Sequence, residues 1–67
     1  MIEIGDEYYD EYNGDYVHVV GYGAGKGVYQ CLVYSFVDED LDFIISGLIL
    51  LYDYEIKKYK LIKKGAY

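Results

Sequence analysis

Four features of this 67-residue sequence contain residue types that carry chemistry in other proteins: His18, Cys31, the glycine-rich stretch 21–27 and the acidic stretch 38–42. His18 stands among valines, and no Ser or Cys lies at a spacing typical of a catalytic pair. Cys31 lies within an apolar run, which is typical of a small buried side chain. We therefore interpret His18 as a structural residue of a sheet and Cys31 as part of the core.

The glycine-rich stretch does not match a phosphate-binding loop. Gly25-Lys26 is followed by Gly27, where a P-loop requires Ser or Thr, and Val20 stands where the motif requires Gly. The pattern G-x-G-x-x-G is not matched either. A flexible connector between two strands is the better interpretation.

The acidic stretch has the spacing of the first ligands of a calcium loop, Asp-x-Asp-x-Asp from position 38 to 42. The sixth position of that loop is Phe43 instead of Gly, and the twelfth is Ile49 instead of Glu. A solvated acidic turn is the better interpretation. One cysteine and one histidine exclude an internal disulfide and a zinc cluster. We therefore expect no catalytic centre, cofactor or metal, and the chain is predicted not to be an enzyme.

Charge is distributed unevenly along the chain. Residues 1–55 contain all twelve acids and one lysine, which gives −11, and residues 56–67 contain five lysines, which gives +5, for a net charge of −6. Such segregation adds self-repulsion to a small domain that has little stability to spare. Two interpretations stay open: the acids serve only solubility, or they form a surface that binds a basic partner.

The second interpretation predicts a partner-binding acidic surface. In an extended segment, alternate carboxylates lie about 6.7 Å apart on one face, and acids alternate in this way at 6–11 and at 38–42. DNA carries one charge per roughly 1.7 Å of helix axis, so two or three neighbouring rows approach its charge density. The predicted surface comprises Asp6, Glu7, Asp10, Glu11, Asp15, Asp38, Glu39, Asp40 and Asp42.

In its size, acidity, eleven tyrosines and lack of catalytic motifs, the chain resembles small phage-encoded proteins that act as DNA mimics. Members of that group block DNA-binding proteins of the host, including nucleoid proteins of the HU type. The resemblance implies that the partner is a basic DNA-binding host protein, met in the cytoplasm of the host cell. It also implies that the chain does not contact nucleic acid directly. The lysine-rich end differs from a uniformly acidic mimic.

Two other functions compete with DNA mimicry. The chain also fits a small SH3-like adaptor that binds a protein through a tyrosine-rich face, with the acids serving only solubility. Direct binding of nucleic acid would use a lysine-rich segment, and the net charge of −6 disfavours it. The segment comprises Lys57, Lys58, Tyr59, Lys60, Lys63 and Lys64. Salt dependence distinguishes DNA mimicry from the adaptor function, because an electrostatic mimic loses affinity as ionic strength rises and an aromatic binding site does not.

The elements that must position these residues are predicted to be strands. Asn13-Gly14 lies between two strand-like runs, at 7–12 and Asp15–Tyr22, and predicts a hairpin with a type I′ turn. Val28–Val37 is rich in β-branched and aromatic residues and contains no breaker, so we expect it to be a central strand.

The densest apolar run, Leu41–Leu51, is predicted to be the element around which the core is built. Its length also fits a helix, but its isoleucines and the mid-run Ser46-Gly47 favour a strand bent at that pair. A turn at Tyr52–Glu55 leads to Ile56–Lys64, where alternating lysines predict a guarded edge strand. The spacing in this last segment also fits a short helix.

We therefore expect one mainly β domain over residues 1–67, a small antiparallel sheet or SH3-like barrel of about five strands. A chain of this length buries only about 60% of its unfolded surface. Its core should be thin, which predicts that a second copy completes it in a homodimer. The N-terminus has no signal-peptide pattern, and the run 43–51 is about half as long as a membrane helix. We thus expect a cytoplasmic protein with no membrane partner.

Overall fold

The structure is a computed structural model that describes residues 1–36 and 43–65. Its elements in chain order are β1 (Glu7–Asp10), β2 (Asp15–Tyr22), β3 (Val28–Phe36), β4 (Phe43–Tyr52), α1 (Asp53–Ile56) and β5 (Lys60–Lys63). All neighbouring strands pair antiparallel in the order β4-β3-β2-β1-β5. The prediction of a mainly β fold with one antiparallel sheet of five strands is confirmed.

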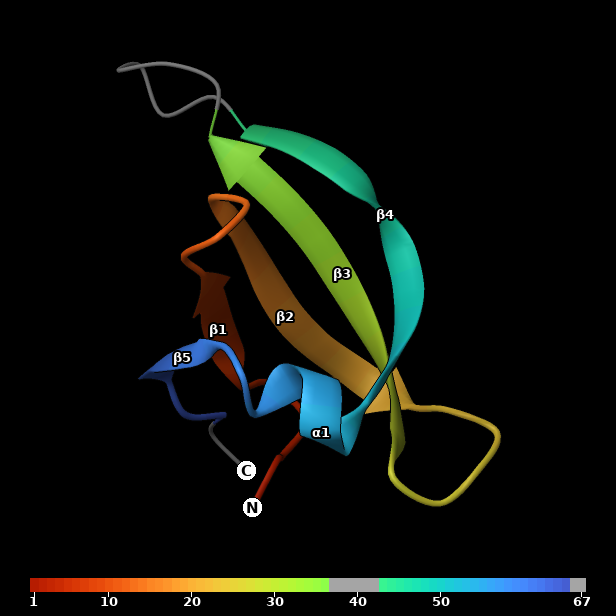
Figure 1. Ribbon diagram of the computed structural model, residues 1–67. Coiled ribbons are helices and arrows are strands. Elements are labelled where there is room, and N and C mark those ends of the chain that lie inside the picture. The colour runs from red at the N-terminus through yellow and green to blue at the C-terminus, as the bar shows by residue number, and fades with distance from the viewer. Residues whose placement is uncertain (37–42, 66–67) are drawn as a thin grey trace.

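The sheet curves strongly but stays open (Figure 1). β4 lies at one edge and pairs with β3, and β5 lies at the other edge and pairs with β1. Closing a barrel would require the two edge strands to pair with each other. Of the two predicted architectures, the open sheet is therefore the one observed.

The predicted hairpin at Asn13-Gly14 is confirmed, but its turn is longer than predicted. Asp10 pairs with Asp15, so the loop holds four residues instead of the two of a type I′ turn. The Asp10 carboxylate accepts hydrogen bonds from the backbone N–H groups of Tyr12 and Asn13 at 3.0 and 3.2 Å. Gly14, with φ of 75°, closes the loop. This side-chain cap stabilises the wider turn.

β3 and β4 form the longest hairpin of the molecule. β3 pairs on both sides, as expected of an interior strand, although β2 holds the middle position of the sheet. β4 bends where its register with β3 shifts between Val33 and Tyr34. Gly47 lies at this shift with φ of 148°, a backbone conformation that residues other than glycine rarely adopt. The predicted bend is confirmed, and the helix alternative for this stretch is wrong.

A single helical turn, α1, connects β4 to β5 and replaces the turn that was predicted for residues 52–55. The Glu55 carboxylate accepts a hydrogen bond from the backbone N–H of Tyr52 at 3.1 Å and caps the start of the turn. Ile56, predicted to begin the last strand, ends α1 instead and is fully buried. β5 is the predicted edge strand, although it is shorter than predicted and all four of its residues are exposed instead of half of them; the short-helix alternative for this segment is wrong.

The core lies on one face of the sheet, which we call the inner face; the opposite face is the outer face. Alternation along each strand directs Val17 and Val19 of β2 and Cys31 of β3 inward. The buried apolar residues of the described chain are Ile2, Tyr8, Val17, Val19, Cys31, Leu51 and Ile56. The core therefore combines β1, β2, β3 and α1 with the N-terminal segment and one residue of β4.

The prediction that the core is built around Leu41–Leu51 is wrong. Over residues 44–52 of β4, Leu51 alone is buried, and five aliphatic side chains are exposed. They are Ile44, Ile45, Leu48, Ile49 and Leu50. The reason is topological, because an edge strand has a neighbour on one side and α1 is too short to cover its length.

Candidate interaction surfaces

Asp6, predicted to face a partner, is fully buried. Its carboxylate accepts hydrogen bonds from the backbone N–H groups of Gly65 and Glu3 at 2.7 and 2.9 Å. The Tyr8 hydroxyl and Lys64 Nζ donate two more, at 3.1 and 3.0 Å. Asp6 therefore fastens the C-terminal segment to the N-terminal one. Its carboxylate has no surface to offer a partner, so its predicted role is corrected to a structural one.

The contacts of Asp6 keep it ionised inside the protein. Burial raises the pKa of this carboxyl, but the four hydrogen bonds together outweigh burial and lower the pKa from 3.8 to about 2. The hydrogen bond to Asp6 in turn raises the pKa of Lys64 above its ordinary value. Burial, followed by the contact with Asp6, raises the pKa of Tyr8 to about 12. Asp6 and Lys64 are thus both charged at neutral pH.

The other predicted acids are divided between structural and exposed positions. Asp10 is buried and caps the β1–β2 loop, so it too cannot serve a partner. Glu7 is half-buried, and its Oε1 lies 3.1 Å from Nδ1 of His18. Asp15 is half-buried and Glu11 is exposed at the hairpin loop. The acids that lie outside the described residues are Asp38, Glu39, Asp40 and Asp42.

The lysine-rich segment lies beside the acidic N-terminal strand. β5 pairs with β1, and Glu7 stands opposite Lys63 in the ladder. Lys64 forms ion pairs with Asp6 and Glu3, at 3.0 and 3.3 Å. Charges that are separated along the sequence are therefore adjacent in the fold. Acids and lysines are therefore less segregated in space than in sequence, and the charge pattern favours an acidic surface less than the sequence indicates.

A row of aromatic side chains crosses the outer face of the sheet. The ladder places Tyr9 opposite Tyr16, Tyr16 opposite Tyr34, and Tyr34 opposite Ile45, so that four strands contribute one residue each. Phe36 follows Tyr34 by two positions on β3 and shares its face. We call Tyr9, Tyr16, Tyr34, Phe36 and Ile45 the aromatic row.

The rings of the aromatic row pack against one another. The ring centroid of Tyr16 lies 5.0 Å from that of Tyr9, 5.3 Å from that of Tyr34 and 5.2 Å from that of Phe36. The Tyr16 and Tyr34 rings are stacked, and the Phe36 ring meets Tyr16 edge-on. Such cross-strand pairs stabilise the sheet and hold each ring in one orientation. Phe36 and Ile45 remain exposed at one end of the row.

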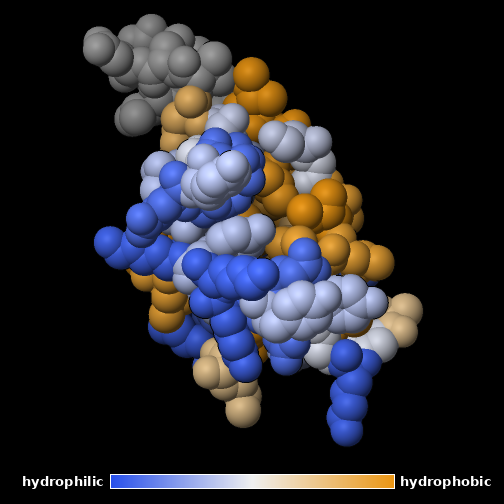
Figure 2. Space-filling model, viewed as in Figure 1, coloured by the Kyte–Doolittle hydropathy of each residue, from blue (hydrophilic) through white to orange (hydrophobic). Residues whose placement is uncertain are grey.

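Beside the aromatic row, β4 gives the molecule an extended apolar surface. Its exposed side chains range from 44% exposure at Ile49 to 61% at Leu48. No residue from Phe43 to Tyr52 is charged. Figure 2 shows hydrophobic residues gathered along the side on which β4 lies in Figure 1. Contiguous apolar surfaces of this kind mark interaction sites, whereas single exposed apolar residues do not.

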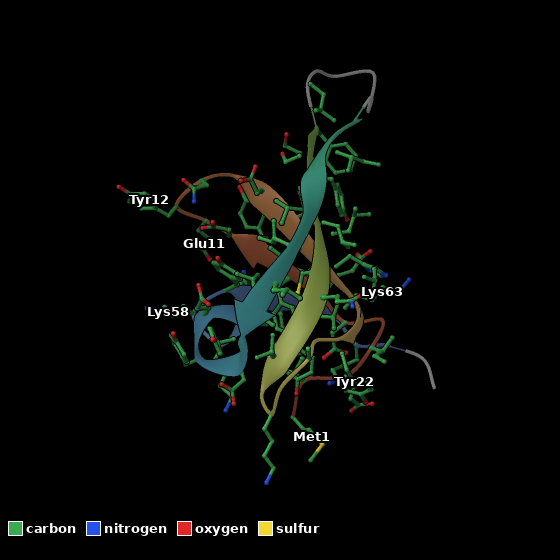
Figure 3. The ribbon with its side chains drawn as sticks, turned by 90° about the vertical axis from the view of Figure 1, so that its right-hand side faces the viewer. Met1, Glu11, Tyr12, Tyr22, Lys58 and Lys63 are labelled. Atoms are coloured by element: carbon green, nitrogen blue, oxygen red, sulfur yellow. The ribbon has the colours of Figure 1, made fainter. Side chains whose placement is uncertain are left out.

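A cleft of about 520 Å³ opens beside the β1–β2 loop. It is lined by Tyr9, Asp10, Glu11, Tyr12, Asn13, Lys58, Tyr59 and Lys60. In Figure 3, Glu11, Tyr12 and Lys58 lie on one side of the molecule, and Lys63 lies on the other. Acids and lysines both line this cleft, so it does not select a ligand by charge.

His18 lies in the sheet and Cys31 lies in the core, as predicted. His18 lies on β2 beside Glu7. Cys31 is fully buried, and burial raises the pKa of its thiol to about 11, which suppresses thiolate chemistry. Within residues 1–36 and 43–65, no cluster of three or more His, Cys, Asp or Glu side chains could hold a metal ion. The part of the chain that the structure describes contains no helix long and apolar enough to cross a membrane.

Sequence reasoning missed the aromatic row and the exposure of β4. The alternation of Tyr16 with Val17, and of Tyr34 with Val33, did indicate that tyrosines share one face. The register that lines up three strands is not encoded in any one of them. For β4, the absence of charge over ten residues indicates an exposed apolar edge, but only when the strand order shows that β4 is an edge strand.

No protein family, curated protein or solved structure matches this chain.

Proposed function

We propose that this chain is a protein-interaction module that binds a protein partner through the aromatic row. The observation that carries the proposal is the cross-strand alignment of Tyr9, Tyr16 and Tyr34, which ends at the exposed Ile45. Tyrosine combines a large apolar ring with a hydroxyl and has few rotatable bonds, so it binds proteins with little loss of side-chain entropy. Rings that already pack against one another lose still less.

The chemistry of the aromatic row suggests the kind of partner. Phe36 and Ile45 supply an apolar end, and the tyrosines supply hydroxyl groups that can donate or accept hydrogen bonds. A protein segment with apolar side chains flanked by backbone or side-chain hydrogen-bonding groups fits this surface. We propose that the interaction takes place in the cytoplasm of the host cell, where the single thiol, Cys31, stays reduced.

The test places a charge at the exposed end of the aromatic row. Ile45→Lys alters a side chain that is 53% exposed, so the fold should tolerate it. Ile62→Lys, at a side chain 44% exposed on β5, is the matched control with the same change of type and charge. Partners captured by the wild type from a lysate are identified, purified and titrated against each protein by calorimetry. We expect Ile45→Lys to weaken binding by about tenfold or more, and Ile62→Lys to stay within about twofold.

A DNA mimic that blocks a basic host protein is the second candidate function. The net charge of −6 and the four acids at 38–42 favour it. It predicts that binding weakens steeply as salt rises. It also predicts that reversing Asp38, Asp40 and Asp42 to Lys abolishes the release of DNA from an HU-type protein in a retention gel. The aromatic-row proposal is wrong if the purified partner is lost with this triple reversal and with high salt but retained by Ile45→Lys.

A further inference from the structure

We infer that two copies of this chain associate through the edge of β4, pairing antiparallel over Leu48–Tyr52 about a two-fold axis at Leu50. This inference concerns a surface next to the aromatic row and does not depend on the proposed function. Its first support is exposure on both faces of one strand. Leu48, Leu50 and Tyr52 are 61%, 60% and 50% exposed on the outer face, and Ile49 is 44% exposed on the inner face.

The two edges of the sheet differ in the protection that they carry. Proteins guard exposed edge strands with charges, prolines, bulges or short length. β5 is four residues long and carries Lys60 and Lys63. β4 is ten residues long and has neither a charge nor a proline. Its bulge falls near Gly47, and Leu48–Tyr52 pairs with β3 without a register shift, so this segment is a regular template for another strand.

A second copy of the chain fits this edge in side-chain size and in charge. With the axis at Leu50, Leu48 of one copy stands opposite Tyr52 of the other, and apolar residues meet along the whole segment. Asp53, the first charge beyond it, falls opposite Gly47, so no acid meets an acid even though each chain carries −6. A segment that is complementary to itself is what a two-fold interface requires.

The exposed area is sufficient for a reversible dimer. Half-exposed side chains along a strand of this length offer on the order of 500 Å² of apolar surface per chain. Two copies therefore bury at most roughly 1,000 Å², which is near the lower limit for a specific interface and is typical of a weak, reversible dimer. The pairing also joins the two sheets edge to edge and places both aromatic rows on one continuous face, because a two-fold axis perpendicular to the sheet keeps outer faces together.

The first experiment is sedimentation equilibrium of the whole chain and two matched variants. Leu50→Lys places two like charges at the axis, and Leu61→Lys makes the same change on β5, where Leu61 is 44% exposed. We expect a monomer–dimer equilibrium for the wild type and for Leu61→Lys. Leu50→Lys should dimerise at least about tenfold more weakly, which corresponds to about 1.4 kcal/mol. A wild type that is monomeric throughout, or a Leu50→Lys variant that dimerises as tightly, overturns the inference.

A cross-link tests the register independently of stability. Opposed residues of an antiparallel ladder have Cα atoms about 4.5–5.5 Å apart, which suits a disulfide. Leu50→Cys should therefore link to itself across the axis when oxidised glutathione accepts the two electrons and both protons and is reduced to two glutathione thiols. Cys31 is buried and should not compete. Leu61→Cys should stay unlinked on a non-reducing gel. If the wild type dimerises but Leu50→Cys does not link faster than Leu61→Cys, pairing through β4 is wrong.

The dimer and the proposed function can fail separately. Ile45 lies on the other side of the bulge from Leu48–Tyr52, so Ile45→Lys should dimerise as the wild type does. If Ile45→Lys dimerises but does not bind the purified partner, both proposals are supported. If the wild type binds the partner while it is a monomer, the dimer proposal is wrong and the proposed function stands.

Discussion

Replacing Asp6 with asparagine tests whether one buried carboxylate holds the two ends of the chain together. Asparagine keeps the shape of the side chain but removes the charge that four donors satisfy. The pKa of Asp6 is about 2 in the folded protein and 3.8 ordinarily. A difference of nearly two units corresponds to about 2–3 kcal/mol of stability at neutral pH. A domain of this size is stable by only a few kcal/mol, so Asp6→Asn should lose a large share of its free energy of unfolding.

The dependence on pH distinguishes the charge from the shape of Asp6. Because the folded pKa lies below the unfolded one, the stabilisation is fully present above the ordinary value of 3.8 and is lost as pH falls towards about 2. The difference in unfolding free energy between wild type and Asp6→Asn should therefore shrink from about 2–3 kcal/mol at pH 7 to near zero at about pH 2. Urea denaturation followed by circular dichroism measures it.

Glu11→Gln controls for the loss of one negative charge, because Glu11 is exposed in the hairpin loop. Its unfolding free energy should stay within about 0.5 kcal/mol of the wild type at both pH values. The reasoning is refuted if Asp6→Asn is as stable as the wild type at pH 7, or if the difference between them is as large in acid as at neutral pH.

Two further predictions concern the core. Ile56→Ala should lower the free energy of unfolding by about 2–5 kcal/mol, because this fully buried side chain is the contribution of α1 to the core. Ile62→Ala on β5 should change it by no more than about 0.5 kcal/mol, and equal losses in urea denaturation would contradict the assignment of Ile56. The Cys31 thiol should resist a thiol reagent at pH 8 in the folded protein and react at once in urea, because burial holds its pKa at about 11. Rapid reaction in the absence of urea would show that the inner face of β3 is open to solvent.

The features that could be predicted from sequence are those set by local chemistry. Asn13-Gly14 predicted the first hairpin, and β-branched and aromatic residues predicted β3. The mid-run glycine predicted the bend in β4, and alternating lysines predicted the edge strand β5. Each of these depends on the backbone and side-chain preferences of a few consecutive residues, which is why no knowledge of the fold was required.

The roles of the acids could not be predicted in the same way. In sequence, nothing distinguishes Asp6 and Asp10 from the exposed Glu11, because all three lie in the same acidic stretch, 6–11. Asp6 is buried because Gly65 and Lys64, nearly sixty positions away in the chain, supply its hydrogen bonds. A pattern of charge along a sequence therefore indicates where carboxylates occur but not which of them reach solvent.

The exposure of β4 follows from the same limit and carries a physical consequence. The density of apolar residues in this strand indicates that burial of its side chains is favourable, but it does not indicate which surface buries them. Within residues 1–36 and 43–65, the inner face is covered by the N-terminal segment, α1 and Tyr59, and the remaining regular elements are strands of the sheet itself. In these described segments Leu51 is buried, and Leu48, Ile49, Leu50 and Tyr52 remain exposed at the edge. The free energy that the apolar run would gain by burial is therefore available to an interaction between molecules, and a strand edge without charge directs that interaction towards another strand.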